Sequence, residues 1–245
     1  MSEGRVIVGR APVHRTADPN SPLDTHYHYG ERVTVLDKTR ATVHCRSAED
    51  GYEGYIAARQ LGAPAAATHY VAGLGAYIYR VPDLRAAPLD YLPRHSPVAV
   101  AETGIVTRDT EYARLDPAGF LPLSCLSAAP PRSPDLVAAA ELYLGAPYLW
   151  GGRSFLGLDC SGLVQQAFRD LGVAVPRDTA DQREAIGSPA EGELRRGDLI
   201  YIPGHVMIYA GDGIVIHASG AGMRVRRDRL ADLPLDPTQF ALRRP

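Results

Sequence analysis

A faint internal repeat restricts what the first half of this 245-residue chain can fold into. Short β-like runs between turn residues fill residues 1–127, and four segments recur in the same order, each displaced by 65 or 66 residues. They are Pro22-Leu23-Asp24 with Pro88-Leu89-Asp90, Val33-Thr34-Val35 with Val98-Ala99-Val100, Gly54-Tyr55-Ile56 with Gly119-Phe120-Leu121, and Leu61 with Leu126. Because four matches keep one order, they indicate a duplication. The pattern predicts two small all-β barrels of about 60 residues each.

A different organisation begins after a linker, Ala128-Ala129-Pro130-Pro131-Arg132. Ser133 is expected to cap a helix that has Pro134 at its first position and extends toward Gly145. Helical periodicity is followed downstream by several short strands, which is an α+β pattern. The predicted domains are residues 1–63 and 64–128 for the barrels and 129–245 for the α+β domain.

Composition excludes some classes of partner. The chain is 45% apolar and 22% charged, with a formal net charge of −2, so electrostatics favour neither nucleic acid nor an anionic membrane. No apolar run is long enough to span a membrane, and the N-terminus shows no secretory signal. The cysteines, Cys45, Cys125 and Cys160, are few and odd in number, which fits a reducing compartment. We therefore expect a cytoplasmic protein.

The stretch Leu158-Asp159-Cys160-Ser161-Gly162-Leu163-Val164 marks the centre of the α+β domain. Apolar residues recur at helical spacing after Cys160, and Gly172 stands where a C-terminal cap is expected. Cys160 is thus predicted at the helix N-terminus, on an exposed tip, where free N–H groups and the helix dipole lower the pKa of a thiol. A small buried hydrophobe is the alternative for a cysteine.

Two histidines downstream supply a base and its orienting partner. If the hairpin 205–217 pivots on Asp212, Met207 pairs with His217, and His205 and His217 lie on one face as diagonal neighbours roughly 7 to 8 Å apart. A shift of one residue would separate them. A thiol, an imidazole and a second ring suit nucleophilic acyl transfer. Zinc is the alternative, but no close Cys-Cys or His-His ligand pair is present, so no metal or cofactor is expected.

Further motifs accompany these residues along the chain. They are Pro147-Tyr148-Leu149-Trp150-Gly151-Gly152, Asp159-Cys160-Ser161-Gly162, Pro176-Arg177-Asp178-Thr179 with Gln182, Gly197-Asp198-Leu199, His205-Val206 and His217-Ala218. In order and spacing, residues 133–240 resemble the NlpC/p60 family of papain-like cell-wall cysteine peptidases. The first half resembles bacterial Src-homology-3 domains, in which a Gly-aromatic-aliphatic strand closes the barrel. The implied fold is a papain-like α+β domain preceded by two Src-homology-3-like barrels.

The resemblance implies hydrolysis of the bond between γ-D-glutamate and a diamino acid, meso-diaminopimelate or L-Lys, in peptidoglycan stem peptides. It makes Cys160 the nucleophile, His205 the base and His217 the orienting residue. Tyr148 would help to hold the oxyanion, and a backbone N–H at the helix start would be the other donor.

Barrels ahead of such a domain, without a signal sequence, resemble the recycling members of the family. Those enzymes cleave free murein tripeptides or tetrapeptides that begin with L-Ala. A carboxylate beside the nucleophile and a barrel tyrosine bind the terminal ammonium, which implies Asp159 and Tyr52, with Tyr55 as the second choice. Ser161 and Thr179 match positions that line the same pocket. Tyr52 would lie on a turn or outer face if Tyr55 packs inward.

Two other functions remain open from the residues. One is an amidase or acyltransferase that uses Cys160 on another amide or ester. The other is a peptidoglycan-binding protein with an inactive papain-like scaffold.

Overall fold

A computed structural model describes residues 2–116 and 119–245. The chain divides into two compact units, residues 1–131 and 132–245, each with its own core. None of the helices in the described residues is long and apolar enough to cross a membrane.

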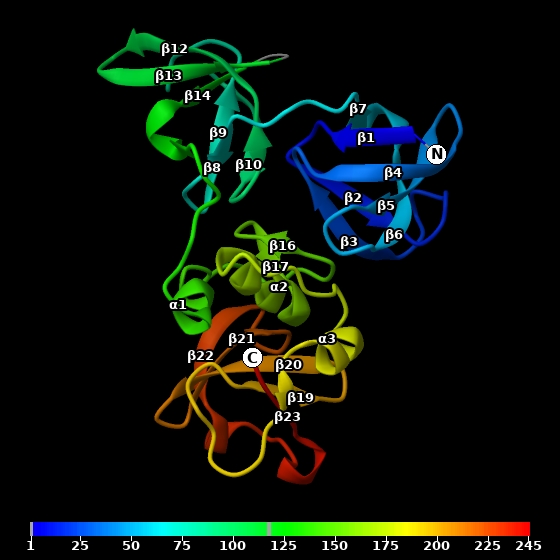
Figure 1. The fold of residues 1–245 in the computed structure, drawn as a ribbon, viewed down its shortest axis with the longest axis vertical. Coiled ribbons are helices and arrows are strands. Elements are labelled where there is room, and N and C mark those ends of the chain that lie inside the picture. The colour runs from blue at the N-terminus through cyan, green and yellow to red at the C-terminus, as the bar shows by residue number, and fades with distance from the viewer. Residues whose placement is uncertain (1, 117–118) are drawn as a thin grey trace. The chain divides into compact units, whose positions relative to one another are not determined.

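The first barrel is a single antiparallel sheet in the order β3-β2-β6-β5-β4-β1-β7, coloured blue in Figure 1. Alternate side chains of β2 and β5 point inward, and they enclose a core around Val13, Tyr27 and Val43. Its elements are β1 (Ser2–Val6), β2 (Arg10–His14), β3 (Leu23–His28), β4 (Arg32–Lys38), β5 (Thr42–Ser47), β6 (Glu53–Ala57), the 3-10 turn η1 (Ala58–Gln60) and β7 (Leu61–Gly62).

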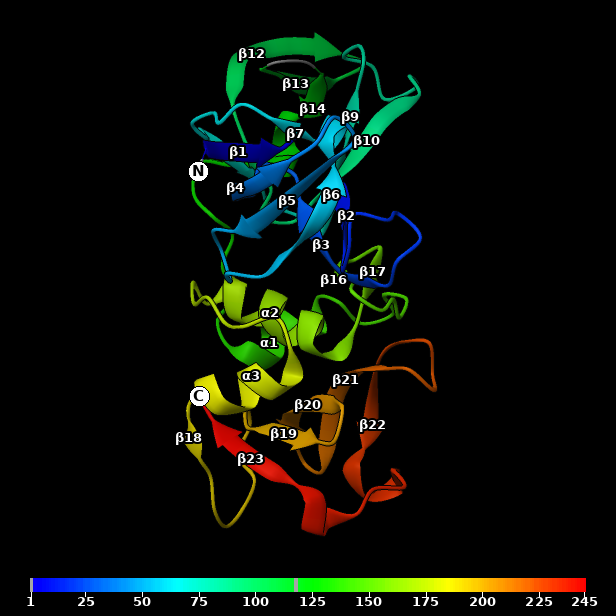
Figure 2. The same ribbon diagram turned by 90° about the vertical axis from the view of Figure 1, so that its right-hand side faces the viewer.

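The second barrel repeats this order of elements in two sheets, β10-β9-β14-β13-β12 and β11-β8-β15. Its strands are drawn apart from those of the first barrel in Figure 1, and Figure 2 shows β9 beside β10, with which it pairs. Its elements are β8 (His69–Val71), β9 (Gly75–Tyr79), β10 (Pro88–Pro93), β11 (Pro97–Val98), β12 (Val100–Thr107), β13 (Thr110–Leu115), β14 (Phe120–Pro122), the 3-10 turn η2 (Leu123–Cys125) and β15 (Leu126–Ser127).

The repeat predicted from the sequence is present in the fold. Strand β9 begins 65 residues after β2, β10 begins 65 after β3, and η2 begins 65 after η1. The two barrels also contact each other, because Tyr29 packs in the core of the second barrel and the Gly9 amide donates to Asp90 Oδ2 at 2.6 Å. The boundaries at 63 and 128 stay predictions.

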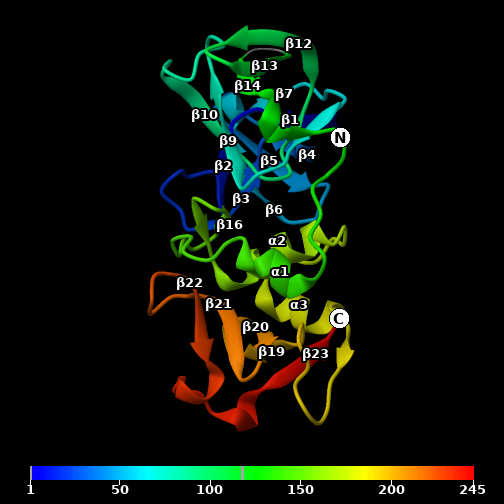
Figure 3. The same cartoon turned by 90° about the vertical axis from the view of Figure 1, so that its left-hand side faces the viewer.

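The second unit places helices along one face of an antiparallel sheet in the order β18-β23-β19-β20-β21-β22 (Figures 1 and 3). The C-terminal strand β23, which the sequence pattern did not reveal, lies between β18 and β19. The elements are α1 (Leu136–Glu141), β16 (Arg153–Ser154), β17 (Gly157–Leu158), α2 (Cys160–Asp170), α3 (Thr179–Ala185), β18 (Ser188–Pro189), β19 (Leu199–Ile202), β20 (His205–Gly211), β21 (Ile214–Ser219), β22 (Arg224–Arg229), the 3-10 turns η3 (Leu230–Asp232) and η4 (Pro237–Gln239), and β23 (Ala241–Arg244).

The predicted start of the first helix is wrong. Asp135, rather than Ser133, caps α1, because its side chain accepts from the Ala138 amide at 2.7 Å. The Ser133 hydroxyl donates instead to Asp170, at the end of α2. Helix α2 begins at Cys160 and is followed by Gly172 with φ +80°, as the sequence predicts.

Candidate active site

The N-terminus of α2 is fixed by Asp159, which is 5% exposed. Its carboxylate has about four lone-pair sites, and it receives four donors. Oδ1 accepts from the Gly162 amide at 2.7 Å and the Ser161 hydroxyl at 3.3 Å, whereas Oδ2 accepts from the Gly151 amide at 2.8 Å and Arg177 Nη2 at 2.5 Å. Asp159 is therefore the helix cap, and it is compensated by a buried guanidinium.

Gly162 makes this helix start possible. A Cβ at this position would lie 2.1 Å from the Gly152 carbonyl oxygen and 2.9 Å from Asp159 Oδ1. Both distances are shorter than any ordinary contact, so a side chain would displace the loop that carries Gly151 and Gly152. The small residue after Cys160 and Ser161 is thus required by the close approach of backbone.

Cys160 is 7% exposed, so the prediction of an exposed tip is wrong. Burial raises the pKa of the Cys160 thiol above its ordinary value of 9.0, and the Asp159 carboxylate raises it further. Hydrogen bonds from the Val206 and Ser161 amides and from Thr179 oppose this rise without cancelling it. The expected lowering by the helix N-terminus does not prevail, because desolvation of the thiolate outweighs it. Cys160 is therefore a neutral thiol at neutral pH.

Strand β20 brings the base to this thiol. The sulfur lies beside the Val206 amide, and His205 precedes Val206 as the first residue of β20. Burial, and to a smaller extent the neighbouring His217, lower the pKa of His205 to about 4. His205 is therefore a neutral imidazole that can accept a proton at neutral pH.

The predicted hairpin register is confirmed. Ile208 pairs with Ile216, so Met207 stands opposite His217, and both histidines share one face. His205 Nε2 lies 2.8 Å from His217 Nδ1, with the ring centroids 5.0 Å apart. His205 Nδ1 is consequently the ring nitrogen that can serve the thiol.

Asp228 extends this chain of side chains, and the sequence analysis did not identify it. His217 Nε2 lies 2.9 Å from Asp228 Oδ2, and His217 is 5% exposed. Asp228 pairs with Val215 across the sheet, two residues from His217 on the same face. The available signal was the single acidic residue among the arginines of Arg226-Arg227-Asp228-Arg229.

The other predicted residues of the second unit lie close to Cys160. Thr179 begins α3, and its Oγ1 is 3.9 Å from Cys160 Sγ. Burial, with the nearby Cys160 and Asp159, raises the pKa of Tyr148, so its hydroxyl stays protonated and can donate. Ser161 is 5% exposed, and its hydroxyl accepts from Arg177 Nη1 at 2.7 Å. The buried Gln182 donates to the Ser161 carbonyl at 3.0 Å, a contact for which the sequence analysis gave no role.

Of the two tyrosines of the first barrel, Tyr55 differs from expectation. Tyr55 does not pack inward, because β6 buries Gly54 and Ile56 on the other side. Its ring stacks on His44 with the centroids 4.5 Å apart. Tyr52 lies between the turn at residues 48–50 and β6, and its carbonyl accepts from the Tyr27 hydroxyl at 2.7 Å.

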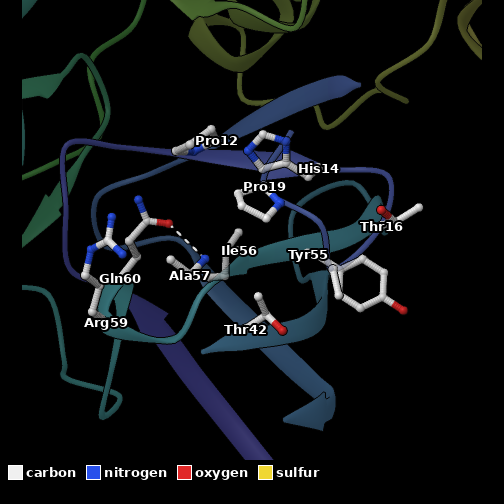
Figure 4. Close-up of a pocket in the computed structure, with 11 residues that line it drawn as sticks. Pro12, His14, Thr16, Pro19, Thr42, Tyr55, Ile56, Ala57, Arg59 and Gln60 are labelled. Carbon is white, nitrogen blue, oxygen red and sulfur yellow. Dashed lines mark hydrogen bonds between the residues drawn. The ribbon is translucent and has the colours of Figure 1, made fainter. Parts of the chain in front are cut away.

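Tyr55 also lines a pocket of about 240 Å³ on the first barrel (Figure 4). Arg59 and Gln60 lie at the opposite end of the view, where Gln60 Oε1 accepts from the Ala57 amide at 3.2 Å. Tyr52 does not line this pocket. The contact of Tyr52 with substrate stays a prediction.

Comparisons with known proteins agree with this geometry. The model of the NlpC/P60 family matches residues 145–244, and the model of the bacterial dipeptidyl-peptidase Sh3 domain matches residues 13–61. A crystal structure of an NlpC/P60 family protein from Bacillus cereus ATCC 10987 has a TM-score of 0.81, covers 99% of both chains and is 21% identical, which shows the shared fold.

Two curated relatives match part of the chain. Dipeptidyl-peptidase 6 of Lysinibacillus sphaericus is 39% identical over 39% of this chain and 36% of its own length. Gamma-D-glutamyl-L-lysine dipeptidyl-peptidase of Bacillus subtilis is 31% identical over 45% of this chain and 40% of its own length. The matches thus span about two fifths or less of these relatives. Residues 145–244 are therefore an NlpC/P60 domain, and residues 13–61 are a bacterial dipeptidyl-peptidase Sh3 domain.

Proposed function

We propose that this protein is a cysteine peptidase that hydrolyses the γ-D-glutamyl–diamino acid bond of murein peptides beginning with free L-Ala. The observation that carries the proposal is the arrangement of the Cys160 thiol beside the strand that begins with His205, whose ring is linked to His217. The name of the Bacillus subtilis relative supports the choice of bond. Recycling of released peptides in the cytoplasm is the proposed setting, and cell fractionation tests it.

The reaction begins from a neutral thiol and a neutral imidazole. His205 Nδ1 takes the thiol proton as Cys160 Sγ attacks the γ-carbonyl carbon, so the two charges form together. The oxyanion receives hydrogen bonds from the Cys160 amide at the start of α2 and from the Tyr148 hydroxyl. His205 then protonates the leaving amine, and a thioester remains. Water attacks the thioester with His205 as base, which releases the L-Ala-D-Glu dipeptide and restores the thiol.

In this proposal the terminal ammonium binds to Asp159, whose carboxylate already accepts four hydrogen bonds. Among the four donors to Asp159, the Ser161 hydroxyl makes the longest bond, at 3.3 Å. The ammonium would replace this hydroxyl at Oδ1, and Ser161 would turn a lone pair toward the ligand. Because Arg177 already balances the carboxylate charge, selection for a free amine rests on directed hydrogen bonds as well as on charge.

Mass spectrometry of two peptides incubated with the purified protein tests the proposal. The peptides are L-Ala-γ-D-Glu-diaminopimelate and the same peptide with its amine acetylated. We expect release of L-Ala-D-Glu from the free peptide, no cleavage of the acetylated one, and no activity in Cys160→Ala. Equal cleavage of both peptides would show that the enzyme does not select for a free amine. Cleavage of neither would refute the proposed peptidase activity.

A further inference from the structure

His205, His217 and Asp228 form a chain of hydrogen bonds that ends at the carboxylate of Asp228. His205 Nε2, His217 Nδ1, His217 Nε2 and Asp228 Oδ2 follow one another at 2.8 Å and 2.9 Å. Three strands contribute to it, because His205 begins β20, His217 lies in β21 and Asp228 lies in β22. Their pairing holds all three on one face of the sheet.

The Asp228 carboxylate at the end of this chain determines which ring nitrogens of the two histidines carry a proton. An ionised carboxylate only accepts, so His217 Nε2 must donate to Asp228. A neutral imidazole has one N–H, which leaves a lone pair on His217 Nδ1. His205 Nε2 must then donate to that lone pair, and His205 Nδ1 is left without a proton. This is the tautomer that a base for the Cys160 thiol requires.

We propose that Asp228 is a positioning residue that sets the tautomers of His217 and His205, so that His205 presents a lone pair to Cys160. The inference rests on the proposed function and deepens it, because it names a residue beyond the thiol and the two imidazoles. Asp228 touches neither substrate nor thiol and acts through His217.

Arg226 fixes the orientation of this carboxylate. Arg226 Nη2 lies 2.5 Å from Asp228 Oδ1, so the two oxygens of Asp228 serve different partners. In an Asp228→Asn variant, Arg226 still requires an acceptor, so the amide oxygen faces Arg226 and the amide NH₂ faces His217. The donor then forces the proton of His217 onto Nδ1 and that of His205 onto its own Nδ1. The variant thus replaces the working tautomer of His205 with one that cannot accept the thiol proton.

Nitrogen-15 NMR of histidine-labelled protein reads the tautomers directly. In the wild type we expect His205 to carry its proton on Nε2, and in Asp228→Asn we expect it on Nδ1. Asp228→Glu keeps an acceptor-only group and should retain the wild-type tautomer. A wild-type His205 protonated on Nδ1, a doubly protonated His217, or an unchanged tautomer in Asp228→Asn would overturn the proposal.

Kinetics on the free peptide give a second readout. We expect kcat of Asp228→Asn to fall on the order of 10²- to 10⁴-fold with KM changed by less than about twofold, because substrate binding is untouched. Asp228→Glu should recover a large part of the loss. Asp212→Asn is the matched control, since Asp212 is exposed on the 211–213 turn with φ +51°, which asparagine tolerates.

Different results would refute the proposed peptidase function and the proposed role of Asp228. A wild type that cleaves neither peptide refutes the proposed function, whereas the NMR result still decides the role of Asp228. Wild-type kcat in a folded Asp228→Asn variant refutes the role of Asp228 and leaves the peptidase intact.

Discussion

At the scale of single residues, Cys160 and His205 are both neutral at neutral pH. Burial raises the pKa of the thiol above 9.0 and lowers that of His205 to about 4, so neither group is ionised between these values. As pH falls, His205 is protonated only near pH 4, and the acid limb of kcat/KM should therefore lie near 4 instead of the usual 6.5 of histidine.

Ultraviolet absorbance of the thiolate separates this neutral pair from an ion pair, which could give a similar acid limb. The difference between wild type and Cys160→Ala should show no thiolate at neutral pH and a rise only above the ordinary thiol pKa of 9.0. Thiolate absorbance that persists at neutral pH and below would show a preformed ion pair and contradict the prediction.

The residues of the site differ in how far the sequence could reveal them. Cys160 and the histidine pair follow from local patterns, a helix start and a tight hairpin whose register is fixed by its turn. Asp228 depends on the next hairpin, where a longer loop, residues 220–223, leaves the register open. The burial of Cys160 could not be predicted either, because it depends on how the loop containing Gly152 packs against α2.

At the scale of the element, the start of α2 depends on an ion pair that no local pattern reveals. Arg177 lies 18 positions after Asp159, and both side chains are nearly inaccessible, with 2% and 7% exposed. Removing Arg177 leaves a buried carboxylate without a cation, which costs about 3 to 5 kcal/mol. We expect Arg177→Ala to lower the free energy of unfolding of the second unit by that amount.

Urea unfolding followed by fluorescence measures this loss, because Trp150 is the single tryptophan of the chain and belongs to the second unit. Arg183→Ala is the control. Arg183 pairs with Glu184 on α3, with side chains 50% and 66% exposed, so its loss should change stability by less than about 0.5 kcal/mol. Similar midpoints for the two variants would show that Arg177 does not support the helix start.

At the scale of the whole molecule, the sequence predicted the two barrels and the α+β domain, but it did not predict the order of the strands within the sheets. The duplication predicts two barrels because Gly54 begins the buried part of β6 and Gly119 directly precedes β14, the equivalent closing strand. Strand β23 was missed because its place between β18 and β19 depends on pairing with residues at least 40 positions away. Its ion pair of Arg244 with the buried Asp198, at 2.7 Å, is likewise a long-range feature.

The role of the first barrel in substrate choice is a prediction about the whole molecule. The backbone of Tyr52 is held by the Tyr27 hydroxyl and by the Ser47 amide, which donates to the Tyr52 carbonyl at 2.9 Å. Tyr52→Phe therefore removes one hydroxyl and leaves the turn in place. If that hydroxyl binds the terminal ammonium, KM for the free peptide should rise about tenfold, since one hydrogen bond to a charged group contributes about 1.5 kcal/mol or more.

Tyr55→Phe is the matched control in the same barrel, because it deletes the same atom from a ring that stacks on His44. We expect its KM to equal that of the wild type, and thermal unfolding of both variants should be unchanged. The opposite result, with KM raised only in Tyr55→Phe, would transfer the ammonium contact to Tyr55. An unchanged KM in both variants would remove barrel tyrosines from substrate recognition, and selection for the free amine would then depend on Asp159 and its neighbours in the second unit.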